Sequence, residues 1–190
     1  FWKFAYPRLH TTFSQEFGKC SVESFYRAIN RVEPSLIRVE ADEVTYNLHI
    51  MLRYELEVGL LEETLRAKDL PEAWNSKMRS YLGIVPSSDA MGVLQDVHWS
   101  HGLIGYFPTY TLGNLASVQF YNQAKKAIPT LSTEIERGEF SNLLDWLRTH
   151  IHRPGRKFLP DELVKQVTGR TLSAEPFIAY LNTKYSEIYT

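Results

Sequence analysis

Residues 35–63 read SLIRVEADEVTYNLHIMLRYELEVGLLEE. The apolar side chains of this stretch recur at spacings of three, four and eight residues, which is the period of an amphipathic helix. They are Leu36, Val44, Leu48, Met51, Leu52, Leu56 and Leu60. We therefore predict one long helix over residues 35–63, which begins just after Pro34.

The helical period continues along the chain, and proline and glycine mark where helices start and stop. Pro71 fits the first turn of a helix that ends at Gly83. Pro108 lacks an amide donor, so we expect one helix on each side of it. Strand patterns are nearly absent, and we predict an all-α fold of about seven helices in a single domain over residues 1–190. Besides the first, the expected helices cover residues 72–82, 93–101, 110–127, 132–151, 160–169 and 174–188.

The composition excludes several classes of protein. Hydrophobic residues make up 44% of the chain, so it is not a disordered protein. The 21 Lys and Arg residues are balanced by 22 Asp and Glu residues, which argues against nucleic acid as a partner. No apolar run approaches the roughly 18 residues of a membrane span. Cys20 is the single cysteine, so no internal disulfide is possible, and we expect a cytoplasmic protein.

The first residues are unusually aromatic, with Phe1, Trp2, Phe4 and Tyr6 among the first six. They follow no initiator Met, and they show none of the grading of a signal peptide. Such side chains sit poorly at a free, solvated terminus. We therefore expect the chain to be a piece of a longer protein whose other part covers them.

Two groups of polar residues could carry chemistry. In the first, Arg38, Asp42 and His49 lie on one face of the predicted helix, with Thr45 between them. A solvated stripe of weak salt bridges is the alternative interpretation of this face.

The second group lies in residues 92–110 and combines Asp, His and Tyr. These residue types can orient an imidazole and donate protons to a developing oxyanion. The alternative is an aromatic core whose polar tips are hydrogen-bonded. The members are Gln95, Asp96, His98, His101, Tyr106 and Tyr110.

Several common catalytic signatures are missing from these residues. The histidine pairs at 98 and 101 and at 150 and 152 lack the His-Glu-x-x-His arrangement of a zinc protease, and we predict no metal site. No Gly-x-Ser-x-Gly motif and no phosphate-binding glycine loop occurs. The residues by themselves predict a helical domain with one cleft and an incomplete catalytic set.

Two stretches resemble the signatures of a known family. IRVEADEVTY at residues 37–46 is similar to I-R-x-x-A-D-E-x-T-Y, and GVLQDVHW at residues 92–99 is similar to G-x-x-Q-D-x-H-W. Both signatures belong to the carboxypeptidase Taq type of thermostable zinc carboxypeptidase. The stretches HGLIGYFPTYTLGNL and LLDWLRTHIHRPGRKFLPDELVKQVTG also resemble that family, so the similarity covers essentially the whole chain.

The resemblance implies a cytosolic, mostly helical homodimer that removes C-terminal residues from peptides with a free C-terminus. Its fold would be the bundle-like C-terminal part of a larger zincin-type metallopeptidase. The family holds zinc, or a similar divalent metal such as cobalt, through His-Glu-x-x-His and a glutamate in His-Glu-Ser-Gln. Those motifs would precede this segment, so we expect the isolated chain to bind no metal and to be inactive.

The resemblance also suggests roles for single residues. Arg38, Asp42, Gln95, Asp96 and Trp99 match the two signatures as substrate-binding residues, and His98, His101, Tyr106 and Tyr110 are the catalytic candidates. His101, Gly105 and Tyr106 keep a spacing that is similar to helical zinc oligopeptidases, which suggests that His101 and Tyr106 donate to the tetrahedral intermediate. Arg38 is suited to the substrate carboxylate, and the alternative is that it pairs with Asp42.

Two functions from different classes remain open. The chain is either the cleft-forming part of a metallocarboxypeptidase, with peptide as substrate and the N-terminal part of the enzyme as partner, or a non-catalytic module for dimerisation or regulation. A His-Glu-x-x-His motif encoded upstream of Phe1 would distinguish the first from the second.

Overall fold

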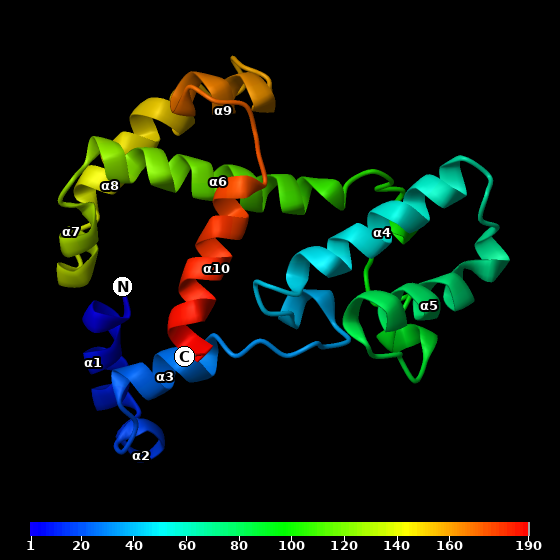
Figure 1. Cartoon of the computed structure of the whole chain (residues 1–190), viewed down its shortest axis with the longest axis horizontal. Helices are drawn as coiled ribbons and strands as arrows, with labels where there is room; N and C mark the ends of the chain where they lie inside the picture. The colour runs from blue at the N-terminus through cyan, green and yellow to red at the C-terminus, as the bar shows by residue number, and fades with distance from the viewer. Residues whose placement is uncertain (190) are drawn as a thin grey trace. The chain divides into compact units, whose positions relative to one another are not determined.

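In the computed structural model, which describes residues 1–189, helices and connecting loops make up the chain and no strand occurs (Figure 1). This confirms the all-α prediction. The described residues contain ten α-helices, where the sequence predicted about seven helices. The chain divides into two compact units, one formed by Phe1–Asn30 and the residues from Asn114 onward, and the other by Arg31–Gly113. No helix within residues 1–189 combines the length and apolar character that crossing a bilayer requires.

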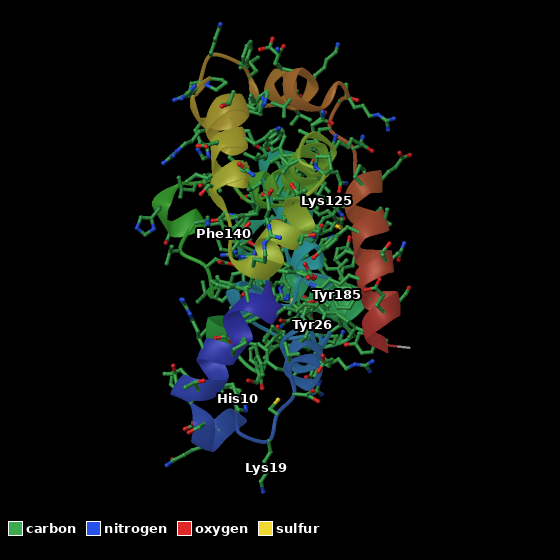
Figure 2. All side chains as sticks on the ribbon, turned by 90° about the vertical axis from the view of Figure 1, so that its left-hand side faces the viewer. His10, Lys19, Tyr26, Lys125, Phe140 and Tyr185 are labelled. Atoms are coloured by element: carbon green, nitrogen blue, oxygen red, sulfur yellow. The ribbon has the colours of Figure 1, made fainter. Side chains whose placement is uncertain are left out.

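The first unit begins with three short helices, α1 (Trp2–Thr12), α2 (Ser14–Phe17) and α3 (Val22–Ile29). The aromatic residues of α1 pack within this unit. The ring of Trp2 lies 4.9 Å from that of Phe25, and the ring of Phe4 lies 6.0 Å from that of Phe140, which Figure 2 labels. These contacts explain how aromatic side chains at the start of the chain find partners inside the same unit.

Helix α1 also packs against α7 (Leu131–Arg137). Gly138 ends α7 in the left-handed conformation, with φ of +77°, and a Cβ atom there would overlap the ring of Phe4. Only glycine meets both conditions. This left-handed residue also explains why the predicted helix over residues 132–151 is two helices, α7 and α8 (Ser141–Leu147).

The rest of the first unit surrounds a small core of Ala124, Leu131 and Trp146. These residues come from α6 (Pro108–Ala127), α7 and α8. Helix α8 continues as a π-helical turn over Arg148–His152. The chain then forms α9 (Pro160–Thr168) and α10 (Glu175–Tyr189). Three of the predicted helices, which end at Ala127, Gly169 and Ile188, agree with the observed ends of α6, α9 and α10 to within one residue.

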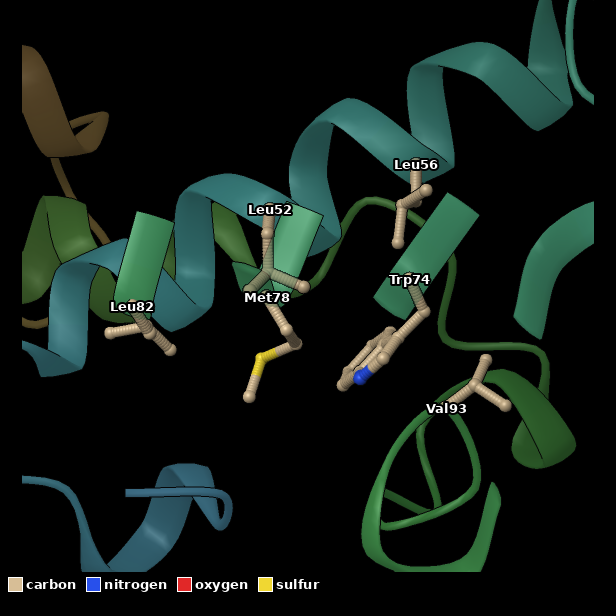
Figure 3. Packing of buried hydrophobic residues seen from close by; sticks show 6 residues of the cluster. All are labelled: Leu52, Leu56, Trp74, Met78, Leu82 and Val93. Atoms are coloured by element: carbon tan, nitrogen blue, oxygen red, sulfur yellow. The ribbon is translucent and has the colours of Figure 1, made fainter. Parts of the chain in front are cut away.

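The second unit is organised by two helices that pack side by side, α4 (Tyr46–Leu61) and α5 (Leu70–Leu82) (Figure 1). Pro71 lies in the first turn of α5 and Gly83 ends it with φ of +71°, as predicted. The core between them is apolar and buried, as Figure 3 shows. It consists of Leu52, Leu56, Trp74, Met78, Leu82 and Val93.

In this unit one predicted helix has the wrong start and another does not form. Helix α4 begins at Tyr46 and not at residue 35, because the Asp42 carboxylate accepts hydrogen bonds from the N–H groups of Val44 and Thr45 and so holds a turn before the helix. Arg38–Glu40 is a separate 3-10 turn, η1. The predicted helical face of Arg38, Asp42, Thr45 and His49 is therefore not formed.

The stretch 93–101 is also not an α-helix. It contains turns between two short 3-10 helices, η3 (Asp89–Met91) and η4 (Trp99–His101). Gly92 adopts φ of −121° and ψ of −116°, far from helical values, and a Cβ atom there would lie only 3.0 Å from Pro86 and 3.3 Å from Trp74. Within this loop, Gln95 and Asp96 turn inward, whereas the flanking Leu94 and Val97 are exposed.

Candidate functional site

Arg38 is the residue through which the two signature stretches meet. Its backbone N–H donates to Oε1 of Gln95 at 2.9 Å, and its Nε and Nη2 atoms donate to Oδ1 of Asp96 at 3.1 and 2.7 Å. Nη1 donates to the hydroxyl of Tyr46 at 3.0 Å. The side chain is buried, and its Cζ atom lies 5.0 Å from the centre of the Tyr110 ring. The partner of Arg38 is therefore Asp96 and not Asp42.

Asp96 is bound from the other side by Arg53 of helix α4. The Nε and Nη2 atoms of Arg53 lie 2.7 and 2.6 Å from Oδ2 of Asp96. Burial acts to raise the pKa of Asp96, but the hydrogen bonds and charges of the two arginines outweigh it, and its pKa is lowered. Asp96 is thus a charged carboxylate between two guanidinium groups.

Gln95 completes this network. Its Oε1 atom accepts from the backbone of Arg38 and from Nη2 of Arg53, and its Nε2 atom donates to the carbonyl groups of Leu36 and Met91. A single amide side chain therefore connects the segment before α4, helix α4 itself and the loop after α5. A side chain whose two ends are both occupied is held in one rotamer.

His98 and Tyr110 form a second pair. The Nε2 atom of His98 lies 3.0 Å from the Tyr110 hydroxyl, and the Tyr106 ring lies 5.8 Å from the imidazole. Burial lowers the pKa of His98; the positive charges of Arg38 and Arg53 act in the same direction, and Asp96 opposes them. His98 is accordingly neutral at pH 7. Because the Asp96 carboxylate lies 3.8 Å from Nδ1, we assign the proton of the neutral ring to Nδ1, which makes Nε2 the acceptor of the Tyr110 hydroxyl.

Six of the nine predicted residues are joined to one another by direct contacts, and the other three bind different partners. Joined by the contacts above are Arg38, Gln95, Asp96, His98, Tyr106 and Tyr110.

Asp42, Trp99 and His101 have other partners. Asp42 bonds to the backbone of Glu33, Val44 and Thr45 and so shapes the turn before α4. The indole of Trp99 donates to Glu57 at 2.9 Å and packs edge-on against Trp74 in the core. Nδ1 of His101 lies 2.8 Å from the Val97 carbonyl, so this nitrogen carries a proton. The substrate-binding and catalytic roles of all nine residues stay predictions.

Three buried polar residues of this unit lie outside the nine candidate site residues and share one face of α4; of the three, the sequence analysis named only His49. His49, Arg53 and Glu57 lie four residues apart and are almost fully buried. A signal for them is present in the sequence, since charged residues at i and i+4 interrupt the apolar pattern on the side that faces the core. The fourth addition, Tyr46, is the first residue of α4 and binds Arg38.

A divalent metal would need three or more grouped ligands. Among residues 1–189, no three His, Cys, Asp or Glu side chains are arranged so that they could hold a metal ion. Within the candidate site the acidic side chain, Asp96, is occupied by two arginines. The described residues therefore do not fit a metal site, and we assign no step to a metal held by them. What the site can offer is hydroxyl, imidazole and guanidinium donors.

Comparison with known proteins covers the whole chain. The profile of the carboxypeptidase Taq (M32) metallopeptidase family matches residues 1–185. Thermostable carboxypeptidase 1 of Thermus thermophilus is 52% identical over 189 residues, and carboxypeptidase 1 of Bacillus subtilis is 42% identical over the same length. The solved structure of an M32 carboxypeptidase from Deinococcus radiodurans is 43% identical and matches with a TM-score of 0.95 over 99% of this chain.

The chain spans only part of these relatives. It covers 37% of the Thermus thermophilus protein, 38% of the Bacillus subtilis protein and 38% of the Deinococcus radiodurans chain. The match nevertheless includes both signature stretches and the residues that join them. The chain belongs to the carboxypeptidase Taq (M32) metallopeptidase family.

Proposed function

We propose that this chain is the cleft-forming part of a metallocarboxypeptidase, which supplies the groups that bind a peptide substrate and stabilise its transition state. The observation that carries the proposal is the junction at Arg38, where side chains of the second signature bind the backbone and guanidinium group of the first. This junction gathers donors of the kind that a peptidase needs. The junction at Arg38 indicates a peptidase because the chain belongs to a family of metallopeptidases.

Arg38 is proposed to bind the free carboxylate of the substrate. Asp96 and Tyr46 use three of its five N–H donors, which leaves two for a ligand within the part of the chain that the structure describes. A guanidinium group suits a carboxylate because it can donate two parallel hydrogen bonds. Gln95 and Asp96 would then act by holding Arg38.

The proposed donor to the oxyanion is Tyr106, whose side chain is 45% exposed and can therefore reach a ligand. His101 is proposed as a second donor. Because its Nδ1–H already binds the Val97 carbonyl, it can donate from Nε2 only as the protonated imidazolium. Tyr110, whose hydroxyl binds His98, is proposed to position the imidazole beside Tyr106.

The divalent metal of such an enzyme, which we propose to be zinc or a similar ion such as cobalt, would be held by residues outside this chain and would supply Lewis-acid chemistry when bound. A cytoplasmic location and a homodimer of the complete enzyme are further proposals. The first is supported by the single cysteine.

The test uses a chimera in which this chain replaces the corresponding segment of the Bacillus subtilis carboxypeptidase. We expect the chimera, with Zn²⁺ or Co²⁺, to release the C-terminal residue of a blocked dipeptide, and the chain alone to release none. A chimera that is folded by circular dichroism but inactive would contradict the proposal.

The second candidate, a non-catalytic module for dimerisation or regulation, makes a different prediction. The coding sequence upstream of Phe1 would then lack His-Glu-x-x-His, and the chain alone would self-associate in sedimentation experiments. The hydrogen-bonded junction at Arg38 favours the first candidate, because a surface for association has no need of a buried polar network.

A further inference from the structure

We infer that Arg53 is a positioning residue for Arg38. It lies outside both signature stretches and contacts the same two side chains that hold Arg38, namely Gln95 and Asp96. The inference rests on the proposed function only in treating Arg38 as a substrate-binding group. The contacts of Arg53 are independent of that role.

All three nitrogen atoms of the Arg53 guanidinium are engaged. Nε donates to Oδ2 of Asp96 at 2.7 Å, Nη2 donates to Oε1 of Gln95 at 2.8 Å, and Nη1 donates to the His49 carbonyl at 2.7 Å. The side chain is 0% exposed, and its Cζ atom lies 4.5 Å from the centre of the Trp74 ring. A planar group bound at every nitrogen and stacked on an indole has a single orientation.

The two arginines share their acceptors in a complementary way. Asp96 accepts hydrogen bonds from Arg53 through Oδ2 and from Arg38 through Oδ1. Oε1 of Gln95 accepts from the side chain of Arg53 and from the backbone of Arg38. If Arg53 were removed, the carboxylate would be anchored on one side only and could rotate about its χ2 bond. Arg38 would then lose the fixed partner that orients its fork.

A purely structural role would not need this arrangement. The neighbouring core positions of α4, Leu52 and Leu56, are filled by leucine, and a buried charge costs more to place than an apolar side chain of similar volume. The bonds of Arg53 to side chains all go to Gln95 and Asp96. The buried guanidinium group of Arg53 therefore fixes the two side chains that accept hydrogen bonds from Arg38.

The test follows the Nε–H group of Arg38 by NMR in the full 190-residue chain labelled with ¹⁵N, and the signal is assigned by its loss in Arg38→Lys. The variants are Arg53→Met, which removes the donors, and Arg53→Lys, which keeps the charge but cannot bind both acceptors at once. Met78→Ala is the matched control, because Met78 is equally buried in the apolar core of the same unit and makes none of the hydrogen bonds described for the network.

We expect the Arg38 Nε–H to exchange with water about tenfold faster in Arg53→Met, the loss that a weakened charge-assisted hydrogen bond gives. In Arg53→Lys the Arg38 Nε–H should also exchange faster, while the circular dichroism spectrum stays that of the unsubstituted chain. Met78→Ala should lower the melting temperature. When the variants are compared at equal free energy of unfolding, it should not speed the exchange of the Arg38 Nε–H.

Three outcomes would overturn the inference: unchanged exchange in Arg53→Met, unchanged exchange in Arg53→Lys when Arg53→Met fails to fold, or the same acceleration in Met78→Ala. Failure of the proposed function gives a different result. The chimera would then be inactive, while the exchange of the Arg38 Nε–H would still depend on Arg53.

Discussion

Asp96 lies beside His98 without binding it, since its Oδ1 atom is 3.8 Å from Nδ1 of the imidazole. Both oxygens of this carboxylate accept hydrogen bonds from arginines. An aspartate that orients a catalytic histidine accepts a hydrogen bond from the N–H of the ring. The neighbour that bonds to His98 is Tyr110 instead, so the Asp-His-Tyr cluster divides into an ionic part around Asp96 and a neutral part around His98.

The first prediction concerns Tyr106 as the proposed oxyanion donor. In the chimera, Tyr106→Phe should lower kcat by about 10²–10³-fold with little change in KM, because the lost hydrogen bond would form only in the transition state. Steady-state kinetics with a blocked dipeptide measure this. Tyr121→Phe, another partly exposed tyrosine, is the control and should leave kcat unchanged. Equal kcat for both variants would remove Tyr106 from the mechanism.

The second prediction separates the two interpretations of Arg38. If it binds the substrate carboxylate, Arg38→Ala in the chimera should raise KM for a free-carboxylate substrate by about tenfold or more, the size of one charge-assisted hydrogen bond. The same peptide with an amidated C-terminus serves as the comparison. Its inhibition constant should be the same for the chimera and for its Arg38→Ala variant. A drop in melting temperature with KM unaltered would mean that Arg38 only forms the ion pair with Asp96.

The third prediction is a loss of stability in acid that depends on His49. Burial and the charges of Arg53 and Arg38 lower the pKa of His49 from 6.5 to about 4, although Asp96 and the Ser35 backbone act in the opposite direction. Its folded pKa is below its unfolded pKa, so the contribution to stability is fully present above pH 6.5 and is lost as the pH falls through 4.

The stability lost between pH 6.5 and pH 4 is on the order of 3 kcal/mol, because the two pKa values of His49 differ by about 2.5. Urea unfolding between pH 7 and pH 4 measures it, and His49→Phe should flatten the pH dependence over that range. The exposed His152 provides the control, since His152→Gln should leave the dependence unaltered. If the free energy of unfolding falls equally with pH in the unsubstituted chain and in His49→Phe, the acid-dependent loss does not come from His49.

The fourth prediction compares two glycines that end helices in the left-handed conformation. Gly138→Ala should destabilise the chain by about 2 kcal/mol or more, because the added Cβ meets the ring of Phe4 in addition to the backbone strain. Gly169→Ala carries the strain alone, about 1 kcal/mol, since its φ is +72° with no atom within 4 Å of the new Cβ. Thermal unfolding measures both, and equal losses would show that the contact with Phe4 does not contribute.

Local pattern alone predicted much of the helical framework. The all-α class, the stop of α5 at Gly83 and the position of α6 follow from apolar periodicity and from the backbone limits of glycine and proline, which act over a few residues. The short helices in the first 30 residues were not predicted, because their aromatic side chains carry little period and find partners mainly in one another and in Phe140.

The candidate site needed the tertiary structure. The sequence drew attention to Arg38, Gln95 and Asp96, but a helical pattern gave no means of seeing that residues 57 and 58 positions apart exchange hydrogen bonds, or that Asp42 closes a turn instead.

Arg53 illustrates the physical reason. On a helix map it is a charged residue next to an apolar stripe, and a charge there is ordinarily assigned to solvent. It can be buried only because a loop far away in sequence brings a carboxylate and an amide oxygen to two of its three nitrogens, and such compensation exists only once the chain has folded. Local periodicity therefore determined where most helices form in this protein, and a local turn at Asp42 decided where α4 starts. Long-range pairing of buried polar groups decided which residues meet at Asp96.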